Sequence, residues 1–563
     1  MSKPTLADRF RAGLIRRTVP GFTPGGHHVD IRRVEVPMPD GVTLVGDLLL
    51  PDDIRPGTPT VVMRTPYGRS LPFLARLPLP LATHGYPVVL VSSRGTAGSG
   101  GVFRPQIDEQ ADGIETLRWV RRQPWFTGRL ASAGGSYLGY TQWAVAGKLA
   151  RDEPETAAEA MSLAVTMPDF GAITWDRGAF SLRNALSWSQ MMRLMSKPFG
   201  FLAILGPNPR LARGLEAMPL RTGDAAAAGA EIDWYQDWLT HEDLTDEYWT
   251  QQSHTASVAD VTVPIVMTTG WYDIFLPWQL RTYEVLAAAG RPPRLTIGPW
   301  NHASNDSVGA DLTQTMHLYD EVFHGTPHPQ EKPVRYFLTG AEEWRESTAW
   351  PPPGTATRAH FLRSGGVLAP DAPATAEEPT AYVYDPAAPT PATGGPTVQP
   401  SKKPDRVDDT EHEQRPDVVT FTSEPLPADL DVTGTPVATV WLRSDRPSVD
   451  VFVRLTDVDA AGRSVSVTDA IRRVGTAATA ATDPARTADG AWPVEVELWP
   501  TGHRFLAGHR IRVQVSSGAH PRYARNAGTG RPAADDTELL VAHQEVLHEP
   551  GRASSIRLPV SAG

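Results

Sequence analysis

A serine between glycines is the first residue of this chain that could do chemistry. Residues 129–140 carry an apolar strand pattern through Gly134 into Ser136 and then into a helical pattern. At a tight strand-to-helix turn, a serine projects its hydroxyl clear of the backbone, and the first helical amide points to where a substrate oxyanion would form. The spacing departs from the usual G-x-S-x-G turn, because glycines stand at 134 and 139 and Leu138 fills a place that is normally small. The alternative interpretation is a glycine-rich turn with a solvated serine.

An aspartate and a histidine that could activate Ser136 follow it along the chain. A serine hydroxyl is a poor nucleophile unless a histidine takes its proton and a carboxylate holds that histidine in the right tautomer. The apolar run of residues 264–273 ends in Gly-Trp-Tyr-Asp, which puts Asp273 on a strand-end loop, and residues 294–302 repeat the pattern up to His302. The order serine, aspartate, histidine is that of the α/β-hydrolase fold and differs from that of the two large serine-protease folds.

Several segments, in the same order along the chain, resemble the CocE/NonD serine hydrolases, the family of cocaine esterase, X-Pro dipeptidyl-peptidase, glutaryl acylase and amino-acid ester hydrolase. The segments around Ser136, Asp273 and His302 carry the resemblance as Gly-Gly-Ser-Tyr-Leu-Gly, Gly-Trp-Tyr-Asp and Gly-Pro-Trp-Asn-His. The resemblance covers nearly the whole chain, from residue 27 to the end. Further matching segments lie at residues 34–45, 64–68, 94–103, 123–125, 507–512 and 516–522.

The resemblance implies roles for five residues. Ser136 would be the nucleophile, His302 the general base and then acid, and Asp273 the carboxylate that orients the histidine. The phenol of Tyr67 and the backbone N–H of Tyr137 would form the oxyanion hole. One preorganised donor of this kind lowers the barrier by roughly 2.7–4 kcal/mol, so the implied roles agree with the chemistry indicated by the serine motif. For Tyr67, the alternative is an ordinary turn tyrosine after Thr-Pro.

One feature of the family pattern is missing from this chain. Relatives commonly carry an aspartate two residues before an Arg-Gly pair, whereas Ser92 occupies that place before Ser93, Arg94 and Gly95. The loss of this carboxylate would alter the support beneath the active site without touching the triad. The floor of the site is therefore expected to differ from that of relatives.

Other residues that could form a site give weaker signals. The glycines of residues 95–100 follow a strand but lack the Lys-Ser/Thr of a phosphate-binding P-loop. The histidine pairs at 27 and 28 and at 503 and 509 lack the accompanying ligands of a metal site, so no metal and no cofactor is expected. Trp175 and Phe275 are the aromatic residues best placed to line an acyl pocket for substrate, with ordinary apolar packing as the alternative.

The strand and helix patterns of the segments that must position these residues predict an α/β fold. Residues 1–146 alternate β-branched runs with helical stretches, which is typical of a parallel sheet with helices on its faces. Residues 150–250 are rich in Ala, Leu, Met and Trp and have helical spacing, which predicts a helical cap. Many short alternating runs after residue 418 predict a β-sandwich, which the family resemblance makes a jelly roll. The expected domains are an N-terminal arm (1–26), an α/β-hydrolase domain in two parts (27–146 and 251–328), the helical cap (147–250) and the jelly roll (329–563).

Composition limits the partners that the chain can have. The chain has 563 residues, a net charge of −11 and a pI near 5.8. Because this net charge is negative, nucleic acid and anionic membranes are not expected partners. No apolar stretch is long enough to span a bilayer, and the first 17 residues lack the apolar core of a secretory signal. The expectation is a cytoplasmic protein with a small-molecule substrate. A homodimer is compatible with the sequence, which leaves the oligomeric state open.

The function expected from these residues is hydrolysis of a carboxylic ester or amide through an acyl-enzyme. X-Pro dipeptidyl aminopeptidase, acylase and acyltransferase activities remain open, because all of them use the same triad. Recognition of a free amine would need a buried carboxylate cluster, for which Asp169 and Asp176 are candidates. An alternative of another class is an inactive binding scaffold that acts through its sandwich domain.

Overall fold

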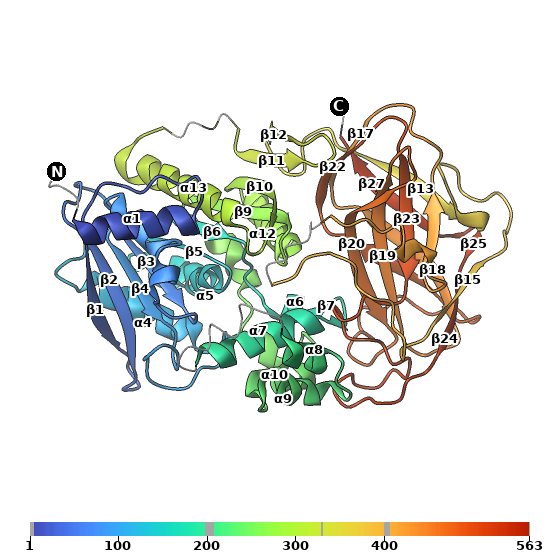
Figure 1. Ribbon diagram of the computed structural model, residues 1–563, viewed down its shortest axis with the longest axis horizontal. Coiled ribbons are helices and arrows are strands. Elements are labelled where there is room, and N and C mark those ends of the chain that lie inside the picture. Colours follow the sequence, from blue (N-terminus) through green and yellow to red (C-terminus); the bar gives the residue numbers. More distant parts are fainter. Residues whose placement is uncertain (1–4, 197–207, 328–329, 331, 399–405, 562–563) are drawn as a thin grey trace. The chain divides into compact units, whose positions relative to one another are not determined.

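The computed structural model describes residues 5–196, 208–327, 330, 332–398 and 406–561 (Figure 1). The chain divides into two compact units. The first unit combines Met1–Phe170 with Thr250–Arg335, and the second combines Gly171–Trp249 with Tyr336–Gly563. The domain boundary expected at residues 328–329 and part of the Pro- and Ala-rich segment after residue 369 lie outside the described residues.

A mostly parallel sheet forms the centre of the first unit, with the order β1-β2-β4-β3-β5-β6-β9-β10. The first two strands pair antiparallel, and the pairs from β4 to β10 are parallel. The strands are β1 (Val29–Pro37), β2 (Thr43–Pro51), β3 (Thr60–Thr65), β4 (Val88–Ser92), β5 (Leu130–Gly135), β6 (Met161–Ala164), β9 (Ile265–Tyr272) and β10 (Arg294–Asn301). β3 and β4 are buried along their whole length, as expected for parallel strands covered on both faces.

Helices cover both faces of this sheet (Figure 1). They are α1 (Leu6–Thr18), α2 (Leu71–Leu74), α3 (Pro78–Thr83), α4 (Glu109–Arg121), α5 (Tyr137–Asp152), α12 (Leu276–Ala288) and α13 (Asn305–His324). One core cluster joins α1, α3 and α13 to the sheet through residues such as Ile15 and Tyr319. A second cluster joins α4 and α5 to it through residues such as Val120 and Leu149. The N-terminal arm expected from the sequence thus contains a helix that packs into the core.

The second unit contains the helical segment. Its elements are α6 (Gly171–Thr174), β7 (Trp175–Asp176), β8 (Ala179–Phe180), α7 (Leu182–Met195), α8 (Pro209–Leu215), α9 (Gly223–Ala228), α10 (Asp233–Thr240) and α11 (Glu247–Thr250). This segment begins at Gly171, later than the residue 147 expected from composition, because α5 continues to Asp152 and β6 adds a strand to the sheet. The sequence of β6, Met-Ser-Leu-Ala, has no β-branched residue that would indicate a strand.

A β-sandwich forms the rest of the second unit, as the sequence predicted. Its strands follow the order β15-β24-β18-β27-β13-β14-β16-β23-β19-β20, with β17, β21 and β22 paired at the side. Alternate residues of β18 are buried, which fits a strand with one face on a core. The strands of the sandwich are β13 (Ala356–Arg363), β14 (Val367–Ala369), β15 (Thr380–Tyr384), β16 (Val419–Thr422), β17 (Leu430–Gly434), β18 (Val437–Ser444), β19 (Val449–Val458), β20 (Ser464–Val474), β21 (Ala491–Glu497), β22 (Thr501–Phe505), β23 (Arg510–Ser516), β24 (Ala542–Val546) and β27 (Ser555–Val560). Outside the sandwich, β11 (Val334–Leu338) and β12 (Glu343–Ser347) follow β10 in the order of the mostly parallel sheet, and β25 (His548–Glu549) pairs with β26 (Arg552–Ala553).

A carboxyl group is buried between α13 and the central sheet. Asp311 on α13 is 4% exposed, and its Oδ1 accepts a hydrogen bond of 3.2 Å from Ser162 Oγ on β6. Burial raises the pKa of Asp311 from its ordinary value of 3.8 to about 7, although the hydrogen bond from Ser162 acts in the opposite direction. The folded protein therefore binds a proton at Asp311 that the unfolded chain loses at a lower pH.

Replacing Asp311 with Asn is expected to remove a pH dependence of stability. Because the pKa is raised in the folded state, the contribution of Asp311 to stability falls as pH rises from about 4 to 7 and stays low above that. Between pH 5 and pH 7, the free energy of unfolding of the wild type should fall by ~2 kcal/mol relative to that of Asp311→Asn. Urea unfolding at several pH values measures this difference, with the exposed Asp306→Asn of the same helix as control. Parallel pH profiles for wild type and Asp311→Asn would contradict it.

Candidate active site

Three side chains from distant parts of the first unit meet in one hydrogen-bonded row. His302 Nε2 lies 3.0 Å from Ser136 Oγ, and His302 Nδ1 lies 2.7 Å from Asp273 Oδ2. The Asp273 side chain is fully buried, and that of His302 is 12% exposed. A carboxylate can only accept, so Nδ1 donates its proton to Asp273 and Nε2 is left to accept from the serine hydroxyl. The structure thus brings together the three residues that the sequence indicated.

The backbone at Ser136 has a conformation that most residues avoid. Its φ of 57° and ψ of −128° lie outside the ordinary regions, between the end of β5 and the start of α5. Gly134, with a φ of 152°, leaves room for Leu138, because an added Cβ would come within 2.4 Å of the Leu138 Cβ. Gly139 likewise approaches the Cβ of Thr166, which an added Cβ would meet at 2.5 Å. The unusual glycine spacing therefore accommodates Leu138 in this turn.

Hydrogen bonds on both sides of Ser136 hold this turn. The Ser136 amide donates to Ala164 O at 3.0 Å and to Val165 O at 3.1 Å. The hydroxyl of Thr166 donates to Ser136 O at 2.8 Å, and the Thr166 amide donates to the Oε1 of Gln279 at 3.0 Å. Gln279 lies on α12, the helix that begins three residues after Asp273. The nucleophile turn is therefore linked to the segment that carries the acid.

Asp273 and His302 follow neighbouring parallel strands, β9 and β10. The Asp273 amide donates to Gly270 O at 3.0 Å, and its Oδ1 accepts from the Phe275 amide at 2.8 Å. Both carboxylate oxygens of Asp273 therefore have partners, one of which is the imidazole. The register between the strands shifts between Gly298 and Asn301, and such an irregularity redirects the residues that follow it. His302 comes directly after this shift.

The two expected pocket aromatics have different surroundings. The ring of Phe275 is buried and packs against the His302 imidazole, with centroids 5.2 Å apart and planes at 80°. Phe275 also contacts the ring of Phe170 at 5.2 Å. Trp175 lies in the second unit, in the core of the helical segment, where its indole N–H donates to Trp238 O at 2.8 Å. These contacts of Trp175 are those of a core residue.

The expected oxyanion donors follow adjacent strands of the sheet. Tyr137 is the first residue of α5, and its side chain is buried. Tyr67 follows β3, which pairs with β5, and its partly buried ring lies 6.4 Å from the ring of Tyr137 in an edge-on arrangement. The Tyr67 amide donates to Thr65 Oγ1 at 3.1 Å, which holds the loop after the strand.

The place of the missing family aspartate is filled by a different arrangement. Ser92 is buried, and its Oγ accepts a hydrogen bond from the guanidinium of Arg69. Arg69 also donates to Val45 O at 3.0 Å, and its Nε lies 3.3 Å from the carboxylate of Asp47 on β2. A carboxylate therefore still faces Arg69, from a neighbouring strand. The sequence analysis missed Asp47, because only the pairing of β2 with β4 brings it near residue 92.

The histidine pairs of the sequence make structural contacts. His503 and His509 both contact the carboxylate of Asp457, at 3.2 and 2.8 Å, and His27 lies 3.1 Å from Asp52. Among the residues that the structure describes, no group of three or more His, Cys, Asp or Glu side chains could hold a metal ion. No helix in the described ranges has the length and hydropathy needed to cross a membrane.

Comparisons with known proteins cover both units. A family model described as X-Pro dipeptidyl-peptidase (S15 family) matches residues 40–304, and one described as the X-Pro dipeptidyl-peptidase C-terminal non-catalytic domain matches residues 328–557. The cocaine esterase of Rhodococcus sp. is 30% identical over 580 residues, which cover 95% of this chain and 99% of that protein. A protein of Mycobacterium bovis named as a serine esterase is 27% identical over 592 residues, covering 87% and 90%.

Solved structures share the fold over almost the whole chain. An aminopeptidase from a marine sediment archaeon, Thaumarchaeota archaeon, has a TM-score of 0.81 at 24% identity and covers 96% of this chain and 98% of that one. An α-amino acid ester hydrolase has a TM-score of 0.76 at 23% identity with the same coverage. The fold and the matches together define a hydrolase of the α/β-hydrolase class with a C-terminal β-rich domain. The chain belongs to the CocE/NonD family of serine hydrolases, to which the sequence motifs pointed.

Substituting Thr166 with Val tests how the nucleophile turn is held. The variant keeps the shape of the side chain but removes the hydrogen bond to Ser136 O, so the strained turn is less constrained. We expect kcat for a p-nitrophenyl ester to fall about tenfold, which corresponds to ~1.4 kcal/mol of barrier. Thr166→Ser, which keeps the hydroxyl, is the control and should retain most of the activity. Equal kcat values for Thr166→Val and wild type would show that this bond is dispensable.

Proposed function

We propose that this protein hydrolyses carboxylic esters through an acyl-enzyme formed on Ser136. The observation that carries the proposal is the position of the His302 imidazole, which bridges Ser136 Oγ and Asp273 Oδ2 at 3.0 and 2.7 Å. Such a row lets the imidazole accept the serine proton while the buried carboxylate stabilises the imidazolium that forms. Membership of a family with a cocaine esterase as relative supports an ester as substrate.

The reaction follows from the donors and acceptors in the row. Ser136 Oγ attacks the carbonyl carbon as its proton moves to His302 Nε2, and the carbonyl oxygen becomes an oxyanion. The Tyr67 phenol and the Tyr137 amide donate to that oxyanion. The intermediate collapses when the C–O bond to the alcohol breaks and His302 returns the proton to this leaving group. Water then gives a proton to His302 as its oxygen attacks the carbonyl carbon of the acyl-enzyme. The bond from that carbon to Ser136 Oγ breaks as His302 returns the proton to Oγ, which releases the acid and the free serine.

A peptidase or acylase acting on a substrate with a free amine is the second candidate. The match of residues 40–304 to the X-Pro dipeptidyl-peptidase model favours it. Recognition of an ammonium group needs a carboxylate available to it, and the two acids considered for this task already have partners. Asp176 accepts from the phenol of Tyr523 at 2.8 Å and pairs with Arg177 at 3.0 Å, while Asp169 accepts from Ser253 Oγ at 2.8 Å. The ion pair of Asp176 with Arg177 favours the ester.

Substituting Ser136 with Ala is expected to abolish covalent labelling by a fluorophosphonate probe, because the probe reacts only with an activated serine. Intact-mass measurement should show one adduct on the wild type and none on the variant, and hydrolysis should fall by at least ~10³-fold. The exposed Ser70→Ala is the control and should be labelled like the wild type. An adduct on folded Ser136→Ala would place the nucleophile elsewhere, and an unlabelled wild type would favour the inactive scaffold.

A substrate panel separates the remaining activities. We expect p-nitrophenyl esters of short acids to be cleaved with a kcat/KM at least ~10²-fold above that for Ala-Pro-p-nitroanilide, because Asp176, one of the two carboxylates considered for amine recognition, is paired with Arg177. Adding alcohol or amine acceptors and measuring the products by mass spectrometry detects acyl transfer. A preference for the dipeptide anilide would overturn the esterase assignment and favour the peptidase.

A further inference from the structure

A buried ion pair lies beside the helix that follows the nucleophile. Arg64 on β3 and Glu109 at the start of α4 are each 4% exposed. The Arg64 guanidinium pairs with Glu109 Oε2 and donates to Glu109 O at 2.7 Å. An isolated buried pair of charges contributes little to stability, because removing both groups from water costs about as much as their attraction returns. A role in positioning neighbouring segments would account for the presence of this pair.

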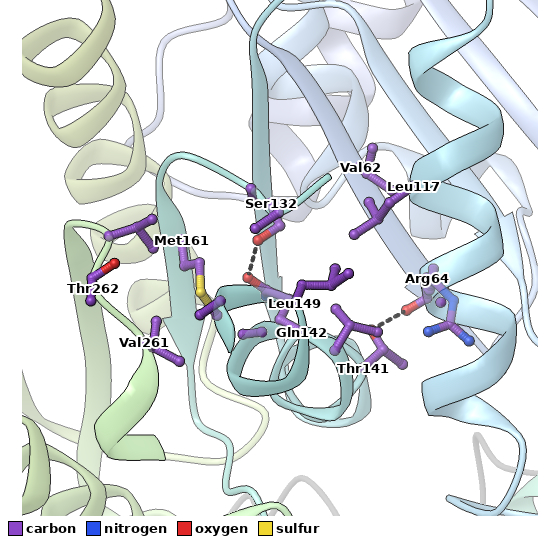
Figure 2. A pocket seen from close by; sticks show the side chains of 17 residues that line it. Val62, Arg64, Leu117, Ser132, Thr141, Gln142, Leu149, Met161, Val261 and Thr262 are labelled. Atoms are coloured by element: carbon purple, nitrogen blue, oxygen red, sulfur yellow. Dashed lines mark hydrogen bonds between the residues drawn. The ribbon is translucent and has the colours of Figure 1, made fainter. Parts of the chain in front are cut away.

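Apolar and hydrogen-bonding side chains both lie around Arg64. Arg64 lies at the edge of a cavity of about 40 Å³ beside α5, close to the apolar side chains of Val62 and Leu117 (Figure 2). The Arg64 carbonyl accepts a hydrogen bond of 3.5 Å from the hydroxyl of Thr141 on α5 (Figure 2). Gly113 of α4 leaves room for the guanidinium, because an added Cβ would meet Arg64 Nη1 at 2.3 Å. The glycine therefore allows α4 to pass close to the guanidinium of Arg64.

The other carboxylate oxygen of Glu109 holds Tyr137. The Tyr137 phenol donates to Glu109 Oε1 at 3.0 Å and accepts from the Gln106 amide at 2.9 Å. Burial first, and then the charge of Glu109, raise the pKa of Tyr137 well above its ordinary value, so the phenol keeps the proton that it donates. The tyrosine ring is therefore fixed at its far end as well as at its backbone.

Arg64 also lies close in sequence to the other expected oxyanion donor, Tyr67. It stands three residues before Tyr67, on the strand that ends at Thr65. The guanidinium on β3 and the phenol of Tyr137 on α5 meet at one carboxylate, that of Glu109. The segments that carry Tyr67 and Tyr137 are thereby connected through two contacts of a single side chain.

We propose that Glu109, paired with Arg64, is a positioning residue that sets the spacing of the two oxyanion donors by holding the Tyr137 phenol and the strand before Tyr67. This proposal rests on the proposed function, in which the Tyr137 amide and the Tyr67 phenol stabilise the oxyanion. Glu109 touches no reacting atom and acts through Tyr137. Because the stabilisation depends on geometry in the transition state, loosening this support should lower kcat and leave KM nearly unchanged.

The test uses Tyr137→Phe, which removes only the phenol oxygen, together with Glu109→Gln, which removes the charge. We expect each variant to lower kcat for a p-nitrophenyl ester by ~10–100-fold with little change in KM, because a small misplacement of a donor is costly. The affinity for a boronic acid, which forms a tetrahedral adduct on serine, should fall in parallel. The double variant should lose less than the product of the two single losses, since both changes act on the same series of contacts from Arg64 through Glu109 to Tyr137.

Tyr319→Phe is the matched control for a lost phenol. The Tyr319 side chain is buried in the same unit and donates to Ser132 O at 2.9 Å, on β5 before the nucleophile turn. This variant should lower the melting temperature to a similar extent and leave kcat and boronate affinity unchanged. A merely structural role for Glu109 would lower the melting temperature of Tyr137→Phe without changing kcat or boronate affinity, and that result would overturn the proposal.

The same measurements distinguish failure of the positioning role from failure of the proposed function. If the wild type carries the fluorophosphonate on Ser136 and Tyr137→Phe reacts with it at the wild-type rate, the positioning role fails and the nucleophile assignment stands. If the wild type is not labelled on Ser136, the proposed function fails and the positioning role fails with it. Should Glu109→Gln not fold, the comparison of Tyr137→Phe with Tyr319→Phe decides the question.

Discussion

The backbone of Ser136, held at a positive φ between a buried strand and a helix, is the constraint on which the rest of the site depends. A side chain in this conformation stands clear of the turn, and the first residue of the helix follows it directly. This geometry is unfavourable for an isolated segment and persists because tertiary contacts impose it. Bonds from the Ser136 amide to the neighbouring β6 segment, and from Thr166 to the Ser136 carbonyl, supply that support.

Buried polar side chains also hold segments around the site in place. Charged and hydrogen-bonding side chains such as Arg64, Glu109 and Gln279 are buried between helices and sheet, where apolar residues would pack at lower cost. These side chains connect separate segments. Arg64 and Glu109 connect β3 with α4, and Gln279 connects α12 with the nucleophile turn. Hydrogen bonds have narrow ranges of distance and angle, whereas apolar contacts have no preferred direction. A polar connection can therefore fix the relative position of two segments more closely than apolar packing does.

The support around Arg69 shows how the sheet supplies a partner for a partly buried charge. The Arg69 guanidinium donates to Ser92 Oγ at the end of β4, and its Nε lies 3.3 Å from the carboxylate of Asp47 on β2. These two strands are paired, so residues distant in sequence face the same guanidinium. A guanidinium removed from water requires such a partner within a few ångströms.

The sequence by itself determined the fold class and predicted the three residues of the proposed triad, because strand and helix periodicity, turn glycines and the order of Ser136, Asp273 and His302 are local signals. Only the tertiary structure decided which residues support them. Contacts between segments distant in sequence decided three features. These are the pairing of Glu109 with Arg64, the burial of Asp311, and the start of the helical segment after a strand that has no β-branched residues. Spacing along the chain carries no information about such contacts, since chain packing alone brings the partners together.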